Sequence, residues 1–413
     1  MLKISMINIK VFKPEVLSIK DDLLKSIHHF KSDSSIGYLN LPHSDRNWDA
    51  SKKMGQLIKN NYDHLILVGI GGSSMGPRCI AELSFKKNIS FLDNIDSIET
   101  ENILDLIQSN LKIAWLFISK SGTTIEVLWT LDLILQKYKA QKTIQNLDLK
   151  FWAHTFFITE LTHNTLHQLS IDHNRPCLEI PINVGGRFSV LSPVGIVITE
   201  FLDLNSDDFR KGSLTALSDD LNVVKISEQF LSSMDRAEII TLFWFYSSRL
   251  RWFGQWIQQL WAESLGKEYS KDNLKAFEFS TPMVAIGASD QHSILQQVIE
   301  GPKNKFVTIF RFKNIENSMT VITDPQFSQT LNMKGLSFGS LIKAETLATQ
   351  KALDDHGIST ALIEFENLNI ETLGYLFMFF QMVVSTMADY KNINAYDQPA
   401  VEHGKKLIKA YLN

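Results

Sequence analysis

The chain has 413 residues, which at about 150 residues per domain suggests two or three domains and a substantial buried core. Its 41 basic and 45 acidic side chains give a net charge of −4, and 44% of residues are hydrophobic and 21% charged, the composition of an ordinary soluble protein. This balance excludes a disordered chain and disfavours a polybasic nucleic-acid binder. Cys79 and Cys177 have no zinc-like spacing and are interpreted as buried thiols in a reducing compartment.

Neither the start of the chain nor its most apolar stretch predicts a membrane or secretory segment. Residues 1–10 mix charged residues into the apolar ones before a signal-peptide core can form. Residues 372–388 are uncharged, but they are fewer than the roughly 20 that a bilayer needs. We therefore expect a buried core helix there, no membrane partner, and a cytoplasmic location.

The first half of the chain alternates short apolar runs with helical periods. Strands are predicted at residues 64–69, 89–92, 113–118 and 156–158. The spacing of apolar residues predicts a helix over 124–139, entered from a small polar cluster. Strands that alternate with helices predict a parallel sheet in an α/β domain.

A second α/β unit is expected after a helical, tryptophan-rich middle at residues 243–261. Its strands are predicted at 283–286, 306–310 and 361–365, and the two units should meet near residues 205–225. Residues 68–73 resemble 284–289, a weak hint that both units use one strand-to-loop design. The end of the chain, from residue 398 to 412, reads as an amphipathic helix.

Two loops carry the residue types that bind anions. The glycine-rich loop at residues 69–77 follows a predicted strand and combines Gly72 with the Ser73 hydroxyl, which allows close backbone approach to a ligand. Its fit to a dinucleotide loop is poor, and a plain tight turn is the other reading. Residues 119–126 place four hydroxyls and Lys120 before a helix, which favours phosphate binding, although a helix cap needs only one of those hydroxyls.

Three further residues carry chemistry suited to proton transfer. Arg187 follows paired glycines, so its planar cation could stabilise a developing oxyanion, unless it is simply a surface arginine. Glu263 lies in an aromatic stretch, where burial raises the pKa of a carboxylate toward the value that a general base needs near neutral pH. An equal alternative is a glutamate on a solvated face that pairs with Lys267. His292 lies at the mouth of a strand-to-helix turn and could exchange protons, although such a histidine is more often structural.

Taken together, these segments resemble the glucose-6-phosphate isomerase (phosphoglucose isomerase) family, bacterial type. The resemblance runs from about residue 60 to the C-terminus. It rests on six motifs in the family's order, at residues 69–77, 119–126, 184–192, 259–267, 287–293 and 396–405. Ala400 departs from it, because the family often has glycine there.

The resemblance implies two sugar-isomerase lobes, each a parallel sheet flanked by helices, that interconvert glucose 6-phosphate and fructose 6-phosphate in glycolysis and gluconeogenesis. It divides the chain into an N-terminal extension (1–50), a first lobe (51–210), a second lobe (211–395) and a C-terminal helix (396–413). It also implies a homodimer with shared active sites and neither metal nor nucleotide cofactor.

The resemblance also assigns roles to the matching positions. Glu263 would be the base, Arg187 would stabilise the cis-enediolate, and His292 from the partner subunit would open the ring with Lys405. The phosphate would be held by Ser119, Lys120, Ser121, Thr123 and Thr124. The sugar would be lined by Gly72, Ser73, Glu126, Gly186 and Gln398.

Two alternatives stay open on the sequence. One is an isomerase of the same fold that acts on mannose 6-phosphate as well or instead, because pocket contacts decide that specificity. The other is a catalytically silent regulator that binds sugar phosphates. A silent binder would keep the hydroxyl loop but has no need for Glu263, Arg187 and His292 together, and no basic helix-turn-helix segment is apparent.

Overall fold

The computed structural model describes residues 6–12, 18–140, 151–314, 319 and 337–412. Contacts divide the chain into two compact units. The first unit is Lys31–Leu214, and the second unit joins Met1–Phe30 to Thr215–Asn413. The N-terminal residues thus group with the C-terminal half. The division at residues 50, 210 and 395 that the family resemblance implies stays a prediction.

The first unit is built on a parallel sheet of strand order β3-β2-β4-β5-β6. Its strands are β2 (His64–Val68), β3 (Ile89–Leu92), β4 (Ile113–Ile118), β5 (Thr155–Thr159) and β6 (Cys177–Glu179). Every residue of β2, β4 and β5 is buried, as expected for strands covered on both faces. The four strands predicted in this half are confirmed, and β6 is a short edge strand that the sequence pattern did not indicate.

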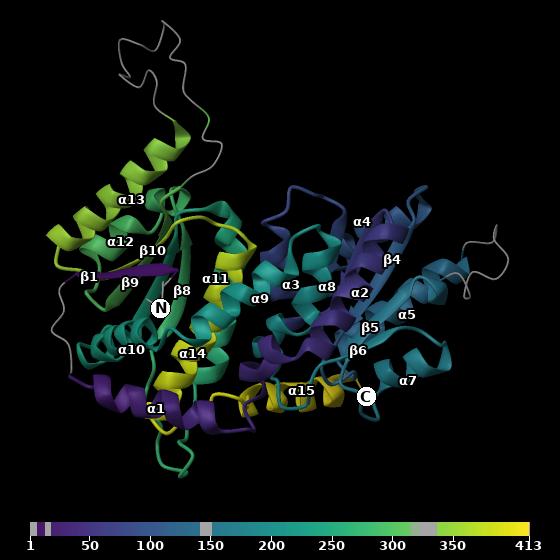
Figure 1. Cartoon of the computed structure of the whole chain (residues 1–413), viewed down its shortest axis with the longest axis horizontal. Coiled ribbons are helices and arrows are strands. Elements are labelled where there is room, and N and C mark those ends of the chain that lie inside the picture. The colour runs from purple at the N-terminus through teal and green to yellow at the C-terminus, as the bar shows by residue number, and fades with distance from the viewer. Residues whose placement is uncertain (1–5, 13–17, 141–150, 315–318, 320–336, 413) are drawn as a thin grey trace, which may run out of the picture. The chain divides into compact units, whose positions relative to one another are not determined.

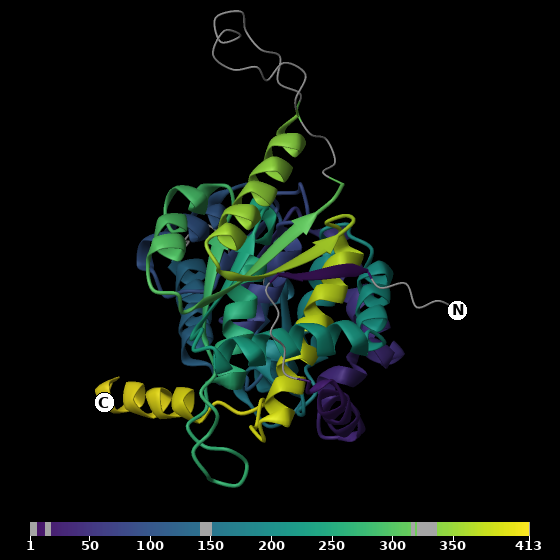
Figure 2. The ribbon, with the colours of Figure 1, turned by 90° about the vertical axis from the view of Figure 1, so that its left-hand side faces the viewer.

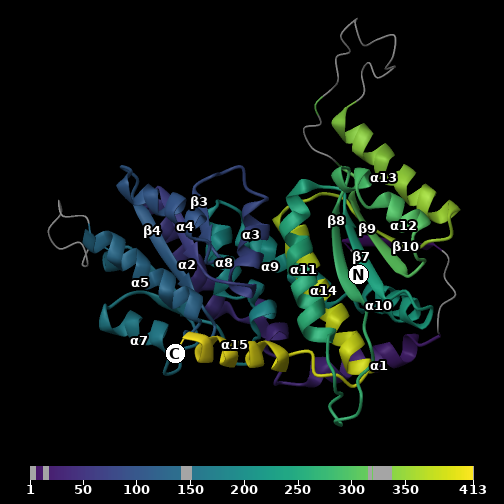
Figure 3. The ribbon, with the colours of Figure 1, turned by 180° about the vertical axis from the view of Figure 1, so that it is seen from behind.

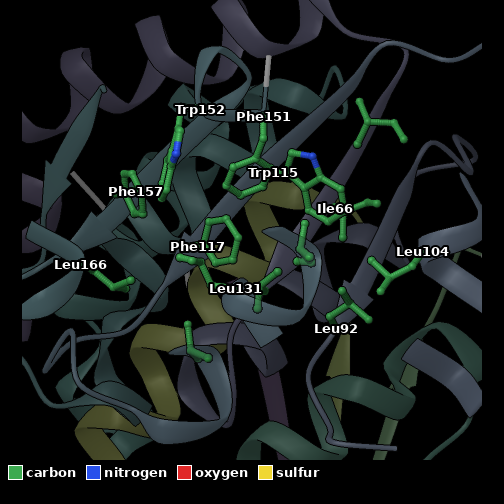
Figure 4. Close-up of a cluster of buried hydrophobic side chains, with 14 residues drawn as sticks. Ile66, Leu92, Leu104, Trp115, Phe117, Leu131, Phe151, Trp152, Phe157 and Leu166 are labelled. Carbon is green, nitrogen blue, oxygen red and sulfur yellow. The ribbon is translucent and has the colours of Figure 1, made fainter. Parts of the chain in front are cut away.

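Helices and 3₁₀ turns surround this sheet. They are η1 (Gly37–His43), α2 (Asp45–Asn61), α3 (Gly72–Ala81), α4 (Ser97–Leu104), η2 (Asp105–Gln108), α5 (Ile125–Ala140), α7 (Thr165–Asp172), η3 (Gly186–Leu191), α8 (Pro193–Phe201) and α9 (Ser206–Leu217). One core, centred on Trp115 and Phe117 of β4, is closed by Leu131 of α5 and Leu166 of α7 (Figure 4). Figure 3 shows where β4, α5 and α7 lie in the first unit. This packing fixes the start of α5, and with it the hydroxyl loop that precedes the helix.

The second unit has a mixed sheet of strand order β1-β10-β9-β7-β8. Its strands are β1 (Ile7–Phe12), β7 (Ile240–Phe245), β8 (Thr281–Ile286), β9 (Lys305–Phe312) and β10 (Ser359–Phe365). All neighbours are parallel except β1, which runs antiparallel to β10 and is the purple strand in Figure 2. The three strands predicted here are confirmed. The helical reading of residues 243–261 is wrong at its start, because residues 243–245 end β7 at the centre of the sheet.

The remaining helices are α1 (Lys20–Ser32), α10 (Asp220–Asp235), η4 (Ser248–Leu250), α11 (Arg251–Leu265), η5 (Ser289–His292), α12 (Leu295–Glu300), α13 (Phe338–Asp355), α14 (Ile370–Tyr390) and α15 (Pro399–Leu412). Rings of α10, α11 and α14 pack on Phe243 from one face, whereas α12 and α13 close the other (Figure 1). Helix α14 is 94% buried in its most apolar window, so the predicted core helix is confirmed. The terminal helix is α15.

Four parallel strands of each sheet share one order, because β3-β2-β4-β5 of the first unit matches β8-β7-β9-β10 of the second. The fifth strands differ: β6 is parallel to β5 and comes last in its sheet, whereas β1 is antiparallel to β10 and comes first in the chain. In such sheets ligands bind outside the carboxyl ends of the strands, where the strand order reverses. In the first unit that place lies between β2 and β4, which are followed by the glycine-rich loop and the hydroxyl loop. The likeness between residues 68–73 and 284–289 does not follow this match, because the second segment belongs to β8, the counterpart of β3.

Candidate active site

The glycine-rich loop after β2 touches the segment that carries Arg187. Gly71 has a φ of +62°, and Gly72 then begins α3. A Cβ atom built on Gly72 would lie 2.2 Å from the Gly186 carbonyl oxygen and 2.8 Å from the Arg187 nitrogen. Glycine is therefore needed at position 72 because two backbones meet there. Two predicted motifs more than 100 residues apart in the sequence are thus neighbours in the first unit.

Arg187 is buried, with only 1% of its surface exposed. Its guanidinium carbon lies 5.4 Å from the ring centre of Phe188, and that ring stacks on Tyr38 at 5.0 Å. The preceding glycine is fixed as well, because the Ser189 hydroxyl donates to the Gly186 carbonyl at 2.7 Å. The reading of Arg187 as a surface side chain is wrong. A cation removed from water in this way interacts strongly with any negative charge that develops beside it.

The hydroxyl loop between β4 and α5 is held by its own side chains. Ser119 is buried, and its Oγ lies 2.7 Å from Thr124 Oγ1. Thr123 Oγ1 donates to Ser121 Oγ at 3.2 Å, and both of these residues are exposed. The four hydroxyls therefore form a partly buried pair, Ser119 with Thr124, and an exposed pair, Ser121 with Thr123. The exposed pair is open to an anion in front of α5, and Glu126 lies half-buried in the first turn of that helix.

Lys120 is tied to the protein rather than extended into solvent. Its Nζ lies 3.3 Å from Glu160 Oε1 and donates to the Ile182 carbonyl at 3.0 Å. These contacts tether the hydroxyl loop to the chain that leads into residues 183–187. A phosphate contact by Lys120 stays a prediction, since its ammonium group already has a carboxylate partner.

Asn164 supports the hydroxyl loop, and the sequence analysis did not find it. Gly122 has a φ of +61°, and a Cβ atom there would lie 1.7 Å from Asn164 Oδ1. The Asn164 side chain also caps α7 by accepting from the His167 nitrogen at 2.9 Å and donates to the Glu160 carbonyl at 2.8 Å. An N-cap signal, asparagine before a helical period, was present in the sequence. Its packing against Gly122 is a tertiary contact that no local pattern reveals.

Glu263 lies near the end of α11 in the second unit and is half-buried. Its carboxylate accepts a hydrogen bond of 2.9 Å from Gln259 Nε2, one helical turn earlier. Glu263 and Gln398 line one pocket of about 870 Å³, so the structure brings these two predicted site residues together. Gln259 had no assigned role; its i, i+4 spacing from Glu263 was the available signal.

The other predicted residues of the second unit lie elsewhere. His292 ends η5 after β8, is exposed, and is not among the residues that line the pocket with Glu263. Its loop is anchored by Asp290, whose Oδ2 accepts from the Ile286 nitrogen at 2.6 Å. Lys405 lies in α15, and its side chain is outside what the structure describes.

The cysteines offer no nucleophile. Burial raises the pKa of Cys79, which lies in α3, well above its usual value. Burial also raises the pKa of Cys177 to about 11, although this residue is half-buried rather than fully buried as the sequence suggested. Both therefore stay protonated near neutral pH. Within the described residues no group of three or more His, Cys, Asp or Glu side chains has the arrangement of a metal site.

Two lobes that share the order of four parallel strands, with a hydroxyl loop at the reversal point of the first sheet, define a sugar-isomerase (SIS-type) α/β fold. A solved tagatose-6-phosphate ketose/aldose isomerase from Escherichia coli shares it, with a TM-score of 0.50, 13% identity, and coverage of 94% of this chain and 98% of that one. The chain belongs to the phosphoglucose isomerase family, which it matches over residues 49–413. It is therefore an enzyme of the isomerase class, and the fold and family expected from the motifs are confirmed.

Individual relatives agree with this assignment. The chain is 32% identical to the glucose-6-phosphate isomerase of Campylobacter jejuni over 98% of this chain and 99% of that protein. A solved glucose-6-phosphate isomerase from Chlamydia trachomatis has the same fold, with a TM-score of 0.83, 18% identity, and coverage of 99% of this chain and 89% of that one.

Proposed function

We propose that this chain interconverts glucose 6-phosphate and fructose 6-phosphate by moving a proton between C2 and C1 through a cis-enediolate. The interconversion is the reaction for which the family is named. The observation that carries the proposal is the Glu263 carboxylate, which Gln259 orients in a pocket shared with Gln398. Aldose–ketose isomerisation needs one carboxylate that first removes a proton and then returns it, and a hydrogen bond to that carboxylate fixes its direction.

The other roles follow from charge and position. Arg187 stabilises the enediolate oxygens, because a buried cation requires little reorganisation when charge develops. Substrate phosphate binds at Ser119, Ser121, Thr123 and Thr124 with Lys120, and Gly72, Ser73, Glu126, Gly186 and Gln398 line the sugar. His292 and Lys405 open the ring before proton transfer. The order of steps is ring opening, enediolate formation, reprotonation and closure.

We further propose a homodimer with shared sites in the cytoplasm, where sugar phosphates are made and consumed. Support for the dimer comes from His292, which is exposed at the end of η5 and does not line the pocket with Glu263. A histidine placed in this way can serve the site of a second copy. Mixing inactive His292→Ala with inactive Glu263→Gln protein tests this, because subunit exchange would restore some activity if each site uses both chains.

The central test is conversion of fructose 6-phosphate to glucose 6-phosphate by purified protein in the presence of a chelator. Wild type is expected to turn over, and Glu263→Gln to lose about 10²- to 10⁴-fold in kcat while still binding fructose 6-phosphate. The matched control is Glu300→Gln on the exposed end of α12, which should keep wild-type activity. Binding without turnover in wild type would favour the silent regulator. A parallel assay with mannose 6-phosphate decides the second alternative.

A further inference from the structure

The ammonium group of Lys267 joins two separate parts of the second unit. Lys267 follows the end of α11, and its side chain is only 6% exposed. Its Nζ donates to the Glu263 carbonyl at 2.8 Å and to the Asp397 carbonyl at 2.5 Å, and lies 2.9 Å from Asp397 Oδ1. An ammonium group has three N–H donors, so these three acceptors can use all of them.

The far end of this connection is the segment that carries Gln398. Asp397 directly precedes Gln398, and its Oδ2 accepts a hydrogen bond of 2.9 Å from Asn394 Nδ2. Residues 391–398, between α14 and α15, form no helix or strand. Its first residues are tied to the end of α14, where the Ile393 nitrogen donates to the Ala388 carbonyl at 2.8 Å. Beyond the buried Ala395, the segment takes its position from side-chain tethers such as this one.

We propose that Lys267 is a positioning residue for the isomerisation: it holds Gln398 at a fixed place opposite the Glu263 carboxylate in their shared pocket. The inference rests on the proposed function, since it gives Glu263 and Gln398 their roles. Lys267 contacts Glu263 through the backbone carbonyl of that residue, while the Lys267 charge lies beside the Asp397 carboxylate. Because active-site geometry is sensitive to shifts of about 1 Å, loosening one tether is enough to lower the rate.

A purely structural role would also explain an ion pair between the buried Lys267 and the half-exposed Asp397, so the test must separate the two. We compare Lys267→Met, Gln398→Ala and the double variant by kcat and KM for fructose 6-phosphate. If Lys267 acts through Gln398, Lys267→Met lowers kcat/KM by about tenfold or more in the wild-type background but by less than about threefold when Gln398 is already alanine. Equal losses in both backgrounds would overturn the proposal.

Two further variants serve as a control and as a replacement for Lys267→Met. Lys275→Met removes an exposed lysine that pairs with Glu278, and it should change kcat/KM less than twofold. If Lys267→Met does not fold, Asp397→Asn replaces it, because this variant removes the charge pair and leaves the main-chain contacts of Lys267 intact. It should show the same dependence on Gln398 with a smaller loss.

Hydrogen–deuterium exchange gives a readout that needs no turnover. Lys267→Met should speed amide exchange in residues 391–398 at least about fivefold while the strands of the second sheet exchange as in wild type. Unchanged exchange in 391–398 would refute the tether even in an active enzyme. Conversely, if the wild type has no isomerase activity but Lys267→Met still speeds exchange in this segment alone, the proposed function is refuted and the tether is established.

Discussion

Replacing Gly72 with alanine adds one methyl group at the point where two backbones meet. The new Cβ would lie 2.2 Å from the Gly186 carbonyl oxygen, whereas real Cβ atoms essentially never approach another heavy atom more closely than 3.0 Å. One backbone must therefore move by roughly 0.8 Å, and the displaced partner includes the amide of Arg187. In an unhindered helix the same change would stabilise the protein by up to about 1 kcal/mol, so a loss of stability would itself reveal the clash.

The expected cost is about 1–3 kcal/mol of unfolding free energy for the overpacking, together with about a hundredfold loss in kcat/KM, because Arg187 moves relative to the enediolate it is proposed to stabilise. Urea denaturation measures the first and the fructose 6-phosphate assay the second. Gly76→Ala is the matched control on the same helix. Its Cβ would lie 2.6 Å from Val190 Cγ2, so it overpacks a side chain rather than the backbone at Arg187.

Both variants are expected to lose stability, but only Gly72→Ala should lose most of its activity. Equal activity losses at equal stability would show that the contact between the glycine-rich loop and residues 186–187 matters only for packing. Full activity in Gly72→Ala, with a folded protein, would refute the placement of Arg187 at the reacting centre.

Other perturbations test the loops and the second sheet. Gly122→Ala places a Cβ against Asn164 at a left-handed position, and should raise KM for fructose 6-phosphate severalfold and lower Tm. Gln259→Leu removes the donor to the proposed base and should lower kcat about tenfold with little change in KM. Burial alone would raise the pKa of Glu364, but its pairing with Arg311 and Lys10 lowers it overall, so this carboxylate stabilises the fold above about pH 4.3 and less as the pH falls. The Tm gap between wild type and Glu364→Gln should therefore narrow between about pH 5 and pH 3, and a constant gap would contradict this reasoning.

The buried parallel strands could be predicted because each is a continuous apolar run with loop residues at both ends. Strands β2 and β4 fall within a residue of their predicted bounds for this reason. Strand β1 was not predicted, although Ile7–Phe12 alternates buried and exposed residues at its start. Its charged and polar residues were weighed only as evidence against a secretory segment. Its pairing with β10 joins residues about 350 positions apart, which no local window can detect.

The candidate site likewise has residues that a local pattern indicates and contacts that only the fold creates. Residue types with evident chemistry, such as Arg187 and Glu263, could be found from the sequence because charge beside glycines or aromatic residues is visible there. Gly72 was singled out because it lies in a glycine-rich loop. Glycine is needed there because the backbone of residues 186–187 lies against it, a contact that exists only in the folded chain. Lys267 was read as a possible partner of a nearby side chain, whereas its main contacts are carbonyl oxygens and a carboxylate 130 residues away.

These contacts share a physical cause that explains why sequence patterns miss them. Backbone carbonyls and amides are present at every position, so a partner such as the Gly186 carbonyl leaves no trace in the residue letters. A proton-transfer site nevertheless depends on them, because a carboxylate, a cation and a bound sugar must be held to within about half an ångström. Candidates for the chemistry, such as Arg187 and Glu263, can thus be proposed from the sequence, while the contacts that we propose to position them, made by Gly72, Asn164 and Lys267, emerge only when the fold brings the backbones together.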